Sequence, residues 1–381
     1  MKTVCDLNKC CGCTACVSIC PKQAIHIEDT VLALNAVVDE SKCVNCGLCH
    51  KVCHLCNLVE KQKLQEWYQG WAKDDIRKGS SSGGLAAAVS KAFVENGGVV
   101  CSCAFADGKF RFSFVDSVDD LIKFAGSKYV KSTPEGVYVE VKNKLQAGEK
   151  VLFVGLPCQV AGLKKFLFNI NTANLFTVDL ICHGTPSVKL LDSYLQEYGF
   201  DINQLKDVKF RDKGKFGLRP DYKFLSHPKI LDRYLIAFLQ GLNYTENCYE
   251  CQYASFERVS DLTLGDSWGS ELKEEMPKGV SLVLVMNDKG RALLDKANVH
   301  LQDVDIENAI SVNHQLQRPT IRHQSREVFF KALEQGKTFS DAVKTAMPKE
   351  CMKPDIKLFL NKIGLLDVIL RIKNVGGGYD K

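Results

Sequence analysis

Eight cysteines near the start of the chain recur at regular spacings. Four of them follow C-x2-C-x2-C-x3-C, and four more repeat that spacing 33 positions later. The eight residues are Cys10, Cys13, Cys16, Cys20, Cys43, Cys46, Cys49 and Cys53. Thiolates at this spacing bind [4Fe–4S] clusters, which carry single electrons, and the last cysteine of each run ligates the cluster of the other run.

The two runs therefore predict two interlocked ligand sets. One set is Cys10, Cys13, Cys16 and Cys53, and the other is Cys20, Cys43, Cys46 and Cys49. A pair of zinc sites is the alternative, but zinc knuckles use separate cysteine pairs rather than sets that exchange a ligand. His54 stands where the first run has Pro21, and Cys56 is near enough in sequence to replace Cys53 as a ligand. Cys5 and Cys11 are interpreted as spare thiols.

Four further cysteines lie outside the repeat. Cys158 and Cys182 each follow a predicted strand, and Cys248 and Cys251 form a C-x2-C pair. Ligands gather beyond the carboxyl ends of strands in α/β sheets, so these four thiols suffice for a third cluster. A redox disulfide between Cys248 and Cys251, a zinc knuckle and unrelated buried thiols are the competing interpretations.

A serine- and glycine-rich segment at residues 79–84 leads into an alanine-rich helix that stops at Gly97 and Gly98. Free N–H groups and the positive end of the helix dipole favour a phosphate at such a position, and Arg77 and Lys78 add positive charge. The alternative is a capped helix after a flexible linker. The sequence has no Walker A pattern and no G-x-G-x-x-G after a strand, so neither a P-loop nor a Rossmann site is predicted.

The elements that must position these residues alternate between strands and helices. Strands or strand–turn–helix units are predicted at residues 97–105, 149–167, 174–195 and 280–297. This alternation predicts an α/β layered fold with some parallel strand pairing. Short strands are also predicted at 24–28 and 31–39, between the cysteine runs, and the polar residues 60–69 are predicted to be a connector.

A basic β-hairpin is predicted at residues 207–225. Its cations either meet an anionic substrate or form a solvated charged face; they are Lys209, Arg211, Lys213, Lys215 and Arg219. Helices are predicted at 325–347 and 355–374. An apolar stripe in the last helix suits docking on the body, on a partner or on a membrane surface; it consists of Phe359, Ile363, Leu366 and Leu370.

Composition sets the broad class. The 381 residues suggest two or three compact units. No run of about eighteen apolar residues and no secretory signal are visible. The 18 cysteines are then expected to be metal ligands or catalytic groups in a cytoplasmic protein. The formal charge of +5 falls when clusters bind, because each contributes roughly −2, so no nucleic-acid partner is predicted.

Six stretches behind the cysteine runs resemble the coenzyme F420 hydrogenase/dehydrogenase beta-subunit family, whose coenzyme is an 8-hydroxy-5-deazaflavin. They are "RKGSSSGG" (77–84), "GSKYVKS" (126–132), "VLFVGLPCQVAGL" (151–163), "VDLICHG" (178–184), "FRDKG" (210–214) and "CYECQYASFERVSDLTLGDSWG" (248–269). The resemblance implies an FAD enzyme with [4Fe–4S] clusters. Its fold would be α/β (α+β overall): a two-cluster ferredoxin module, an α/β flavin-binding domain of this family's type and a helical tail.

The resemblance also implies roles for single residues. The cofactor-binding residues would be Arg77, Ser80, Ser81, Ser82, Gly83, Gly84, Lys128, Tyr129, Gln159 and Trp268, with the serines and glycines at the FAD phosphates. The catalytic candidates are His183, Lys131 and Asp266. Cys158, Cys182, Cys248 and Cys251 match the family's cysteine positions, which strengthens the prediction of a third cluster.

The expected function is an oxidoreductase that passes electrons between [4Fe–4S] clusters and FAD, with hydride transfer to or from an organic substrate. Coenzyme F420 is one candidate substrate, and ferredoxin or another redox protein is the expected partner. The alternative is a non-catalytic electron-transfer subunit of a larger complex, and a homo-oligomer is compatible with either. The expected units are 1–62 (ferredoxin domain), 63–160 and 161–322 (two parts of the flavin-binding domain) and 323–381 (helical tail).

Overall fold

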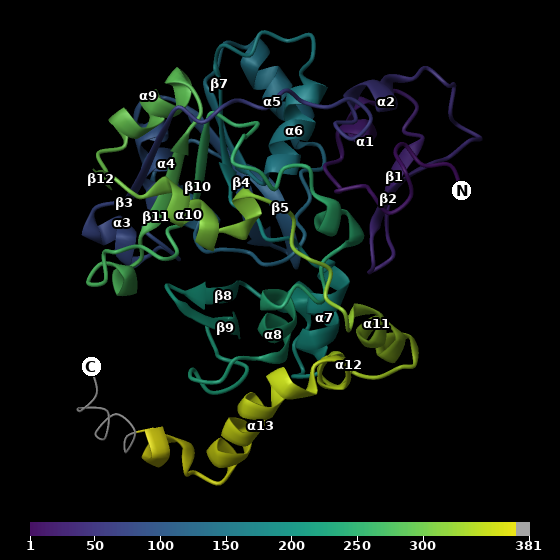
Figure 1. Ribbon diagram of the computed structural model, residues 1–381. Helices are drawn as coiled ribbons and strands as arrows, with labels where there is room; N and C mark the ends of the chain where they lie inside the picture. Colours follow the sequence, from purple (N-terminus) through teal and green to yellow (C-terminus); the bar gives the residue numbers. More distant parts are fainter. Residues whose placement is uncertain (371–381) are drawn as a thin grey trace.

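The computed structural model describes residues 1–370 and consists of an N-terminal module, a central sheet and a lower helical layer (Figure 1). The module contains the helices α1 (Ala15–Ile19) and α2 (Leu48–Val52) and the strands β1 (Ile25–Asp29) and β2 (Leu34–Val38). The two strands pair antiparallel, as the pattern between the cysteine runs predicts. Each short helix follows a residue with positive φ, Thr14 at 61° and Gly47 at 74°.

The central sheet has eight strands in the order β12-β3-β11-β10-β7-β6-β4-β5. They are β3 (Glu66–Trp71), β4 (Val99–Ala106), β5 (Lys109–Val115), β6 (Val151–Gly155), β7 (Leu175–Leu180), β10 (Leu262–Asp266), β11 (Ser281–Val285) and β12 (His300–Gln302). β4, β6, β7 and β10 run parallel, while β11, β3 and β12 continue the sheet antiparallel. The predicted α/β fold with some parallel pairing is therefore confirmed.

Helices cover both faces of this sheet. Successive residues of β6 alternate between two cores, because side chains of a strand point to opposite faces: Val151 and Phe153 join one core, and Leu152 and Val154 the other. α3 (Asp74–Lys78), α4 (Leu85–Glu95) and α9 (Asp288–Lys296) lie on one side, and α5 (Val137–Gln146) and α6 (Pro157–Phe166) on the other. α10 (Ile306–Val312) covers β11 near the sheet's edge.

The N-terminal module shares a core with the central sheet. Ala15 of α1 and Val52 of α2 are fully buried in the same apolar cluster as α5 and α6. Figure 1 shows α1 and α2 directly beside α6. The cysteine loops are therefore held against the sheet by apolar packing as well as by any bound metal.

The lower layer combines a hairpin with helices. It contains β8 (Val208–Asp212), β9 (Lys215–Pro220), α7 (Val188–Gln196), α8 (Arg233–Leu239), α11 (Arg326–Glu334), α12 (Phe339–Ala346) and α13 (Pro348–Lys362). The predicted hairpin is confirmed, whereas the helix predicted at 325–347 is divided into α11 and α12 by a break at Gly336, whose φ is 80°. Aromatic residues such as Tyr194, Tyr234 and Phe339 are fully buried in its core.

Two parts of the structure differ from expectation. The predicted connector 60–69 contains the start of β3, which is a sheet strand despite its polar residues. Gln69 is buried there because its amide bonds to Glu271, Ser270 and the carbonyl oxygen of Asp303. A polar strand is stable in a sheet once its side chains have partners.

The last predicted helix also differs. α13 begins at Pro348 rather than near 355 and ends at Lys362, residues 366–370 are helical again, and the rest of the predicted helix lies outside the described residues. Of the apolar stripe, Leu366 is buried, whereas Phe359 is 63% exposed and Ile363 48%. The break after Lys362, with Gly364 at a φ of 75°, separates the two halves of the stripe. Within residues 1–370, no helix combines the length and apolarity needed to cross a bilayer.

Candidate redox site

The parallel strands bring the predicted site residues to one edge of the sheet. Cys158 follows β6, Cys182 and His183 follow β7, and Asp266 ends β10 with Trp268 just beyond. β6 pairs parallel with β7, and β7 with β10. Because the carboxyl ends of parallel strands meet at one edge, residues from three separate motifs become neighbours.

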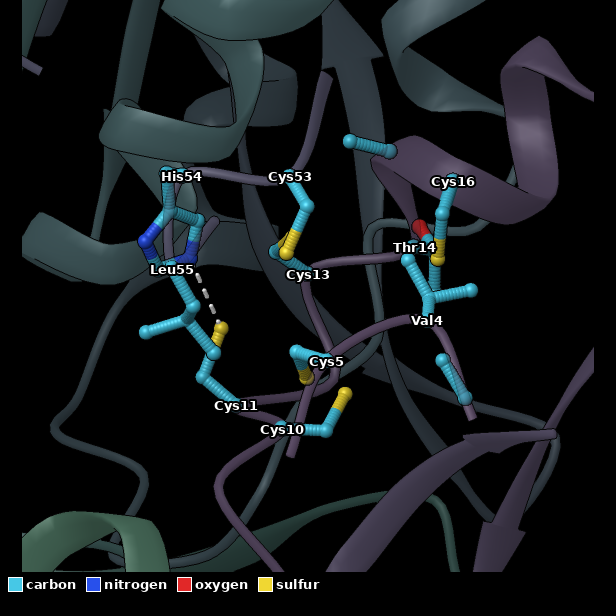
Figure 2. A pocket seen from close by; sticks show the side chains of 12 residues that line it. Val4, Cys5, Cys10, Cys11, Cys13, Thr14, Cys16, Cys53, His54 and Leu55 are labelled. Atoms are coloured by element: carbon cyan, nitrogen blue, oxygen red, sulfur yellow. Dashed lines mark hydrogen bonds between the residues drawn. The ribbon is translucent and has the colours of Figure 1, made fainter. Parts of the chain in front are cut away.

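The four cysteines of the first predicted set lie around one cavity, together with Cys5 and Cys11. Cys10, Cys13, Cys16 and Cys53, here called site 1, line one small cavity inside the N-terminal module. Figure 2 shows their side chains directed toward this common space, with Cys5, Cys11 and His54 beside them. A buried donor set made of sulfur atoms fits an iron–sulfur cluster, for which thiolates are the protein ligands.

The second set, site 2, is Cys20, Cys43, Cys46 and Cys49. It lies nearer the surface, since Cys46 is exposed and the other three are half-buried. The two runs share a detail: Gly12 N–H donates to Cys10 Sγ at 3.3 Å, and Asn45 N–H donates to Cys43 Sγ at 3.4 Å. Backbone N–H groups aimed at ligand sulfurs stabilise cluster-bound thiolates and tune their potential, so both sets fit the expected clusters.

The third set, site 3, is Cys158, Cys182, Cys248 and Cys251. Burial raises the pKa of the Cys182 thiol, and the charges of Cys248, Cys158 and Cys251 raise it further. Burial likewise raises the pKa of Cys251 to about 12, and the charges of Cys158 and Cys248 contribute to this rise. The four cysteines come from three separate motifs, and Cys158 and Cys251 pack against the same apolar cluster, so the four are candidate ligands of one site.

Lys131 lies beside site 3. Burial alone would lower the pKa of its ammonium group, yet the pKa is raised because the charges of Cys248, Cys158, Cys11 and Cys182 surround it. A buried ammonium ion offsets the negative charge that thiolates and a bound cluster would carry. Lys131 also lines a cavity of about 460 Å³ between the module and the β4–β5 turn.

The serine and glycine loop is folded by its own side chains. Ser80 and Ser82 donate to the carbonyl oxygens of Ile76 and Val280, and Ser81 Oγ accepts from Ser127 N–H at 3.0 Å. No side chain caps the N-terminus of α4, which follows Gly84. The N–H groups of the first turn of α4, rather than the serine hydroxyls, are therefore the donors available to a phosphate.

Two predicted flavin-binding cations are held by protein groups. The buried Arg77 side chain pairs with Glu275 at 2.5 Å and donates to the carbonyl oxygen of Gly279. Lys128 Nζ donates to three backbone carbonyl oxygens, of Phe124, Ala125 and Gly126. Their side chains brace the loops at 79–84 and 124–128 rather than projecting freely.

Arg211, predicted only as one cation of the basic hairpin, contacts three predicted site residues. Its guanidinium donates to both carboxylate oxygens of Asp266 (2.7 and 3.0 Å), to Tyr129 Oη (3.0 Å) and to the carbonyl oxygen of Ser81 (2.8 Å). The Trp268 ring lies 5.9 Å away. Only the pairing of β8 with β9 and the fold of the sheet reveal this, because the five residues come from four motifs far apart in the sequence.

The solvated-face interpretation of the hairpin is therefore wrong for two of its cations. Arg211 is 7% exposed, and Lys213 Nζ reaches the carbonyl oxygens of Arg77 and Ser82. Both side chains thus hold the serine and glycine loop in place by hydrogen bonds to its backbone. Lys215, by contrast, is exposed as expected.

His183 and Gln159 occupy supporting positions. His183 Nδ1 lies 2.5 Å from Gln315 Nε2, and burial lowers the pKa of His183 to about 4, so its ring is neutral near pH 7. Gln159 Oε1 accepts from Leu156 N–H at 2.8 Å, and its Nε2 donates to Ser132 Oγ at 3.0 Å. Gln159 thus caps α6 and ties it to the segment that carries Lys131.

α6 packs against site 1 through a glycine. A Cβ atom at Gly162 would lie 2.9 Å from Cys13 Sγ and 3.1 Å from Tyr138 Oη. Gly162→Ala should therefore displace Cys13 and reduce site 1 occupancy, although alanine is normally the better helix residue by about 1 kcal/mol. Iron per chain and the electron paramagnetic resonance (EPR) signal of the reduced module measure this effect.

Gly214→Ala is the matched control, because nothing lies within 4 Å of a Cβ at Gly214. If both variants contain as much iron per chain as the wild type, the contact between α6 and Cys13 tolerates a methyl group.

Comparison with known proteins agrees with this architecture. Residues 67–136 and 148–308 match the N-terminal and C-terminal parts of the coenzyme F420 hydrogenase/dehydrogenase beta subunit, and residues 9–55 match a 4Fe-4S dicluster domain. A coenzyme F420-dependent sulfite reductase of Methanocaldococcus jannaschii is 24% identical over 80% of this chain and 49% of its own length. This chain thus spans about half of that relative.

One further relative and one solved structure are matched over more of their own length. A subunit of the F420H2 dehydrogenase of Methanosarcina mazei is 23% identical over 68% of this chain and 78% of its own. A chain of the F420-reducing [NiFe] hydrogenase complex from Methanosarcina barkeri superposes with a TM-score of 0.49 at 19% identity, over 68% of this chain and 90% of that one. Together with the matched motifs and the cysteine sets, the family matches show that the chain belongs to the coenzyme F420 hydrogenase/dehydrogenase beta-subunit family and carries a 4Fe-4S dicluster domain.

Proposed function

We propose that this protein is an iron–sulfur flavoprotein oxidoreductase that exchanges electrons between a ferredoxin-type partner and an organic hydride donor or acceptor. The observation that carries the proposal is the packing of the two-cluster module on site 3: Cys11 and Cys13 of the module lie in one apolar cluster, against which Cys158 and Cys251 pack. FAD, when bound, supplies the conversion between single electrons and a hydride. Site 2 is the more exposed cysteine set and suits electron entry.

The chain's own residues suit the binding of FAD. The uncapped start of α4 offers backbone N–H donors to a diphosphate. Arg211 orients Asp266 and Tyr129 at the strand edge, and the neutral His183 is positioned by Gln315. We assign these residues to binding and orientation of the flavin and of its hydride partner.

A separate cavity of about 460 Å³ lies beside the first cysteine run, and of the predicted site residues only Lys131 lines it, so we assign it to an organic molecule other than the flavin. Small-molecule sites commonly have volumes of about 300–1,000 Å³ with mostly apolar walls. Phe110, Ile25 and Val188 form apolar walls here, and Lys131 adds a cation. Coenzyme F420 is the first acceptor to test, because two relatives are named for it.

The test is iron and flavin analysis of anaerobically purified protein, followed by turnover with a reduced ferredoxin and coenzyme F420. We expect about twelve irons and about one FAD per chain, with bleaching of the deazaflavin absorbance. Iron without flavin would favour the alternative, a non-catalytic electron-transfer subunit. If the protein contains flavin and iron but does not reduce coenzyme F420, other hydride acceptors should be tested next.

Arg211→Lys tests the flavin assignment. Lysine keeps the charge but loses the two-pronged contact with Asp266, and each lost charge-assisted hydrogen bond is worth about 1.5–3 kcal/mol. We expect the variant to bind FAD at least about tenfold more weakly than the wild type and to contain the same amount of iron. The measurement is flavin released on desalting, against the hairpin control Arg219→Lys; equal retention in both variants would remove Arg211 from the flavin site.

A further inference from the structure

His54 differs in environment from its counterpart in the other cysteine run. The first run ends Cys20-Pro21, and Pro21 is exposed. The second run ends Cys53-His54, and His54 is 1% exposed. Proline has neither an N–H group nor a polar side chain, so the substitution creates a polar group at a buried position. Such a group requires hydrogen-bond partners.

His54 has a partner on each ring nitrogen. Its Nε2 lies 3.1 Å from Cys11 Sγ, and its Nδ1 lies 2.7 Å from Tyr253 Oη (Figure 2 shows the first contact). Gln252 Nε2 donates to the His54 carbonyl oxygen at 3.3 Å and to Tyr253 Oη at 3.1 Å. Cys11 and Tyr253 are also buried, with 6% and 4% exposure.

The ends of this chain of contacts belong to different metal sites. His54 directly follows Cys53 of site 1, and Tyr253 stands two residues after Cys251 of site 3. Cys11 directly follows Cys10 of site 1, and it shares an apolar cluster with Tyr253, against which Cys158 and Cys251 of site 3 pack. Both sites are thus linked by covalent and hydrogen bonds through His54.

We propose that Cys11, His54 and Tyr253 form a bridge that fixes site 1 against site 3 and sets the rate at which electrons cross between them. The inference rests on the proposed third cluster. In the step, one electron leaves the cluster at site 1, which is oxidised, and enters the cluster at site 3, which is reduced. No bond forms or breaks, and no proton is transferred.

The bridge acts by holding the cysteine ligands of the two sites in a fixed orientation. Groups that hydrogen-bond around metal ligands fix ligand orientation and tune the metal centre, and their loss typically costs 10–100-fold in affinity or activity. Hydrogen bonding near cluster sulfurs also shifts reduction potential. His54 and Tyr253 are therefore positioning residues, distinct from the cysteine ligands.

The experiment uses the anaerobic full-length holoprotein. Tyr253→Phe removes one hydroxyl and keeps the ring, and His54→Ala removes the imidazole. Tyr249→Phe and His50→Ala are the controls: the Tyr249 hydroxyl bonds to Gly241, and His50 is exposed on the module. Rapid-freeze EPR after a pulse of reductant follows the appearance of each reduced cluster, and a redox titration gives the potential of each.

We expect full iron in Tyr253→Phe, on the order of tenfold slower arrival of electrons at site 3, and a shifted site 1 potential. Both controls should transfer electrons at the wild-type rate. Wild-type rates and potentials in the Tyr253 and His54 variants, with about twelve irons each, would overturn the bridge alone. About eight irons in the wild-type protein would remove the acceptor at site 3, and would overturn the third cluster and this inference together.

Discussion

Serine in place of Cys251 should lower the iron content from about twelve to about eight atoms per chain, because one of three clusters loses a thiolate ligand. Cys251 lies in site 3, where the charges of Cys158 and Cys248 already influence its thiol. The visible absorbance per chain should fall by about a third. The two clusters of the N-terminal module should keep their EPR signals, since Cys251 is a ligand of neither site 1 nor site 2.

Cys351→Ser is the matched control for this prediction. Cys351 is fully buried, like the site 3 cysteines, but lies in α13 within the lower core. Both variants should then lose a similar amount of packing, whereas only the Cys251→Ser variant should lose iron. Equal iron in the two variants would contradict a third cluster at Cys158, Cys182, Cys248 and Cys251.

Arg258→Met should be the most destabilising single change outside the metal ligands, by about 3–5 kcal/mol. Arg258 pairs with Asp179 at 2.9 Å, and their side chains are 2% and 0% exposed. Arg258 also donates to the carbonyl oxygens of Tyr253 and Ser255. Methionine would leave the Asp179 carboxylate buried beside Thr263 without its cation, and would release the segment that follows Cys251.

Denaturation midpoints of the holoprotein, monitored by far-UV circular dichroism, measure this effect. Arg291→Met is the control, because Arg291 pairs with Glu66 and Asp295 where all three side chains are at least 38% exposed; exposed pairs contribute about 0–1 kcal/mol. Adding Asp179→Leu to Arg258→Met should restore part of the stability by removing the unpaired charge. A midpoint for Arg258→Met equal to the control would show that the buried pair is not required.

Local patterns accounted for much of the architecture. The duplicated cysteine spacing predicted the members of sites 1 and 2, and the structure gathers Cys10, Cys13, Cys16 and Cys53 around one cavity. Continuous apolar runs predicted β6 and β11, both buried along their length. These signals are local, since ligand spacing and strand burial depend on residues close together in sequence.

Other features depended on neighbours far apart in the sequence. The polar residues of β3 resemble a connector until Gln69 finds Glu271 and Ser270 across the sheet. Arg211 resembles a surface cation until the hairpin places it against Asp266. A buried polar group is stable only with its partner, and no local pattern identifies a partner fifty or more residues away.

The sequence by itself determined the kind of chemistry: thiolate runs for two clusters, four further cysteines at positions that suit a third, and a helix start suited to phosphate. Only the tertiary structure decided how the cysteine sets and the other site residues are placed relative to one another. The side-by-side parallel strands β6, β7 and β10 bring Cys158, Cys182 and Asp266 to one edge, and the apolar packing of α1 and α2 on α6 holds the N-terminal module beside that edge. Distances between sites depend on long-range packing, which spacing along the chain does not encode.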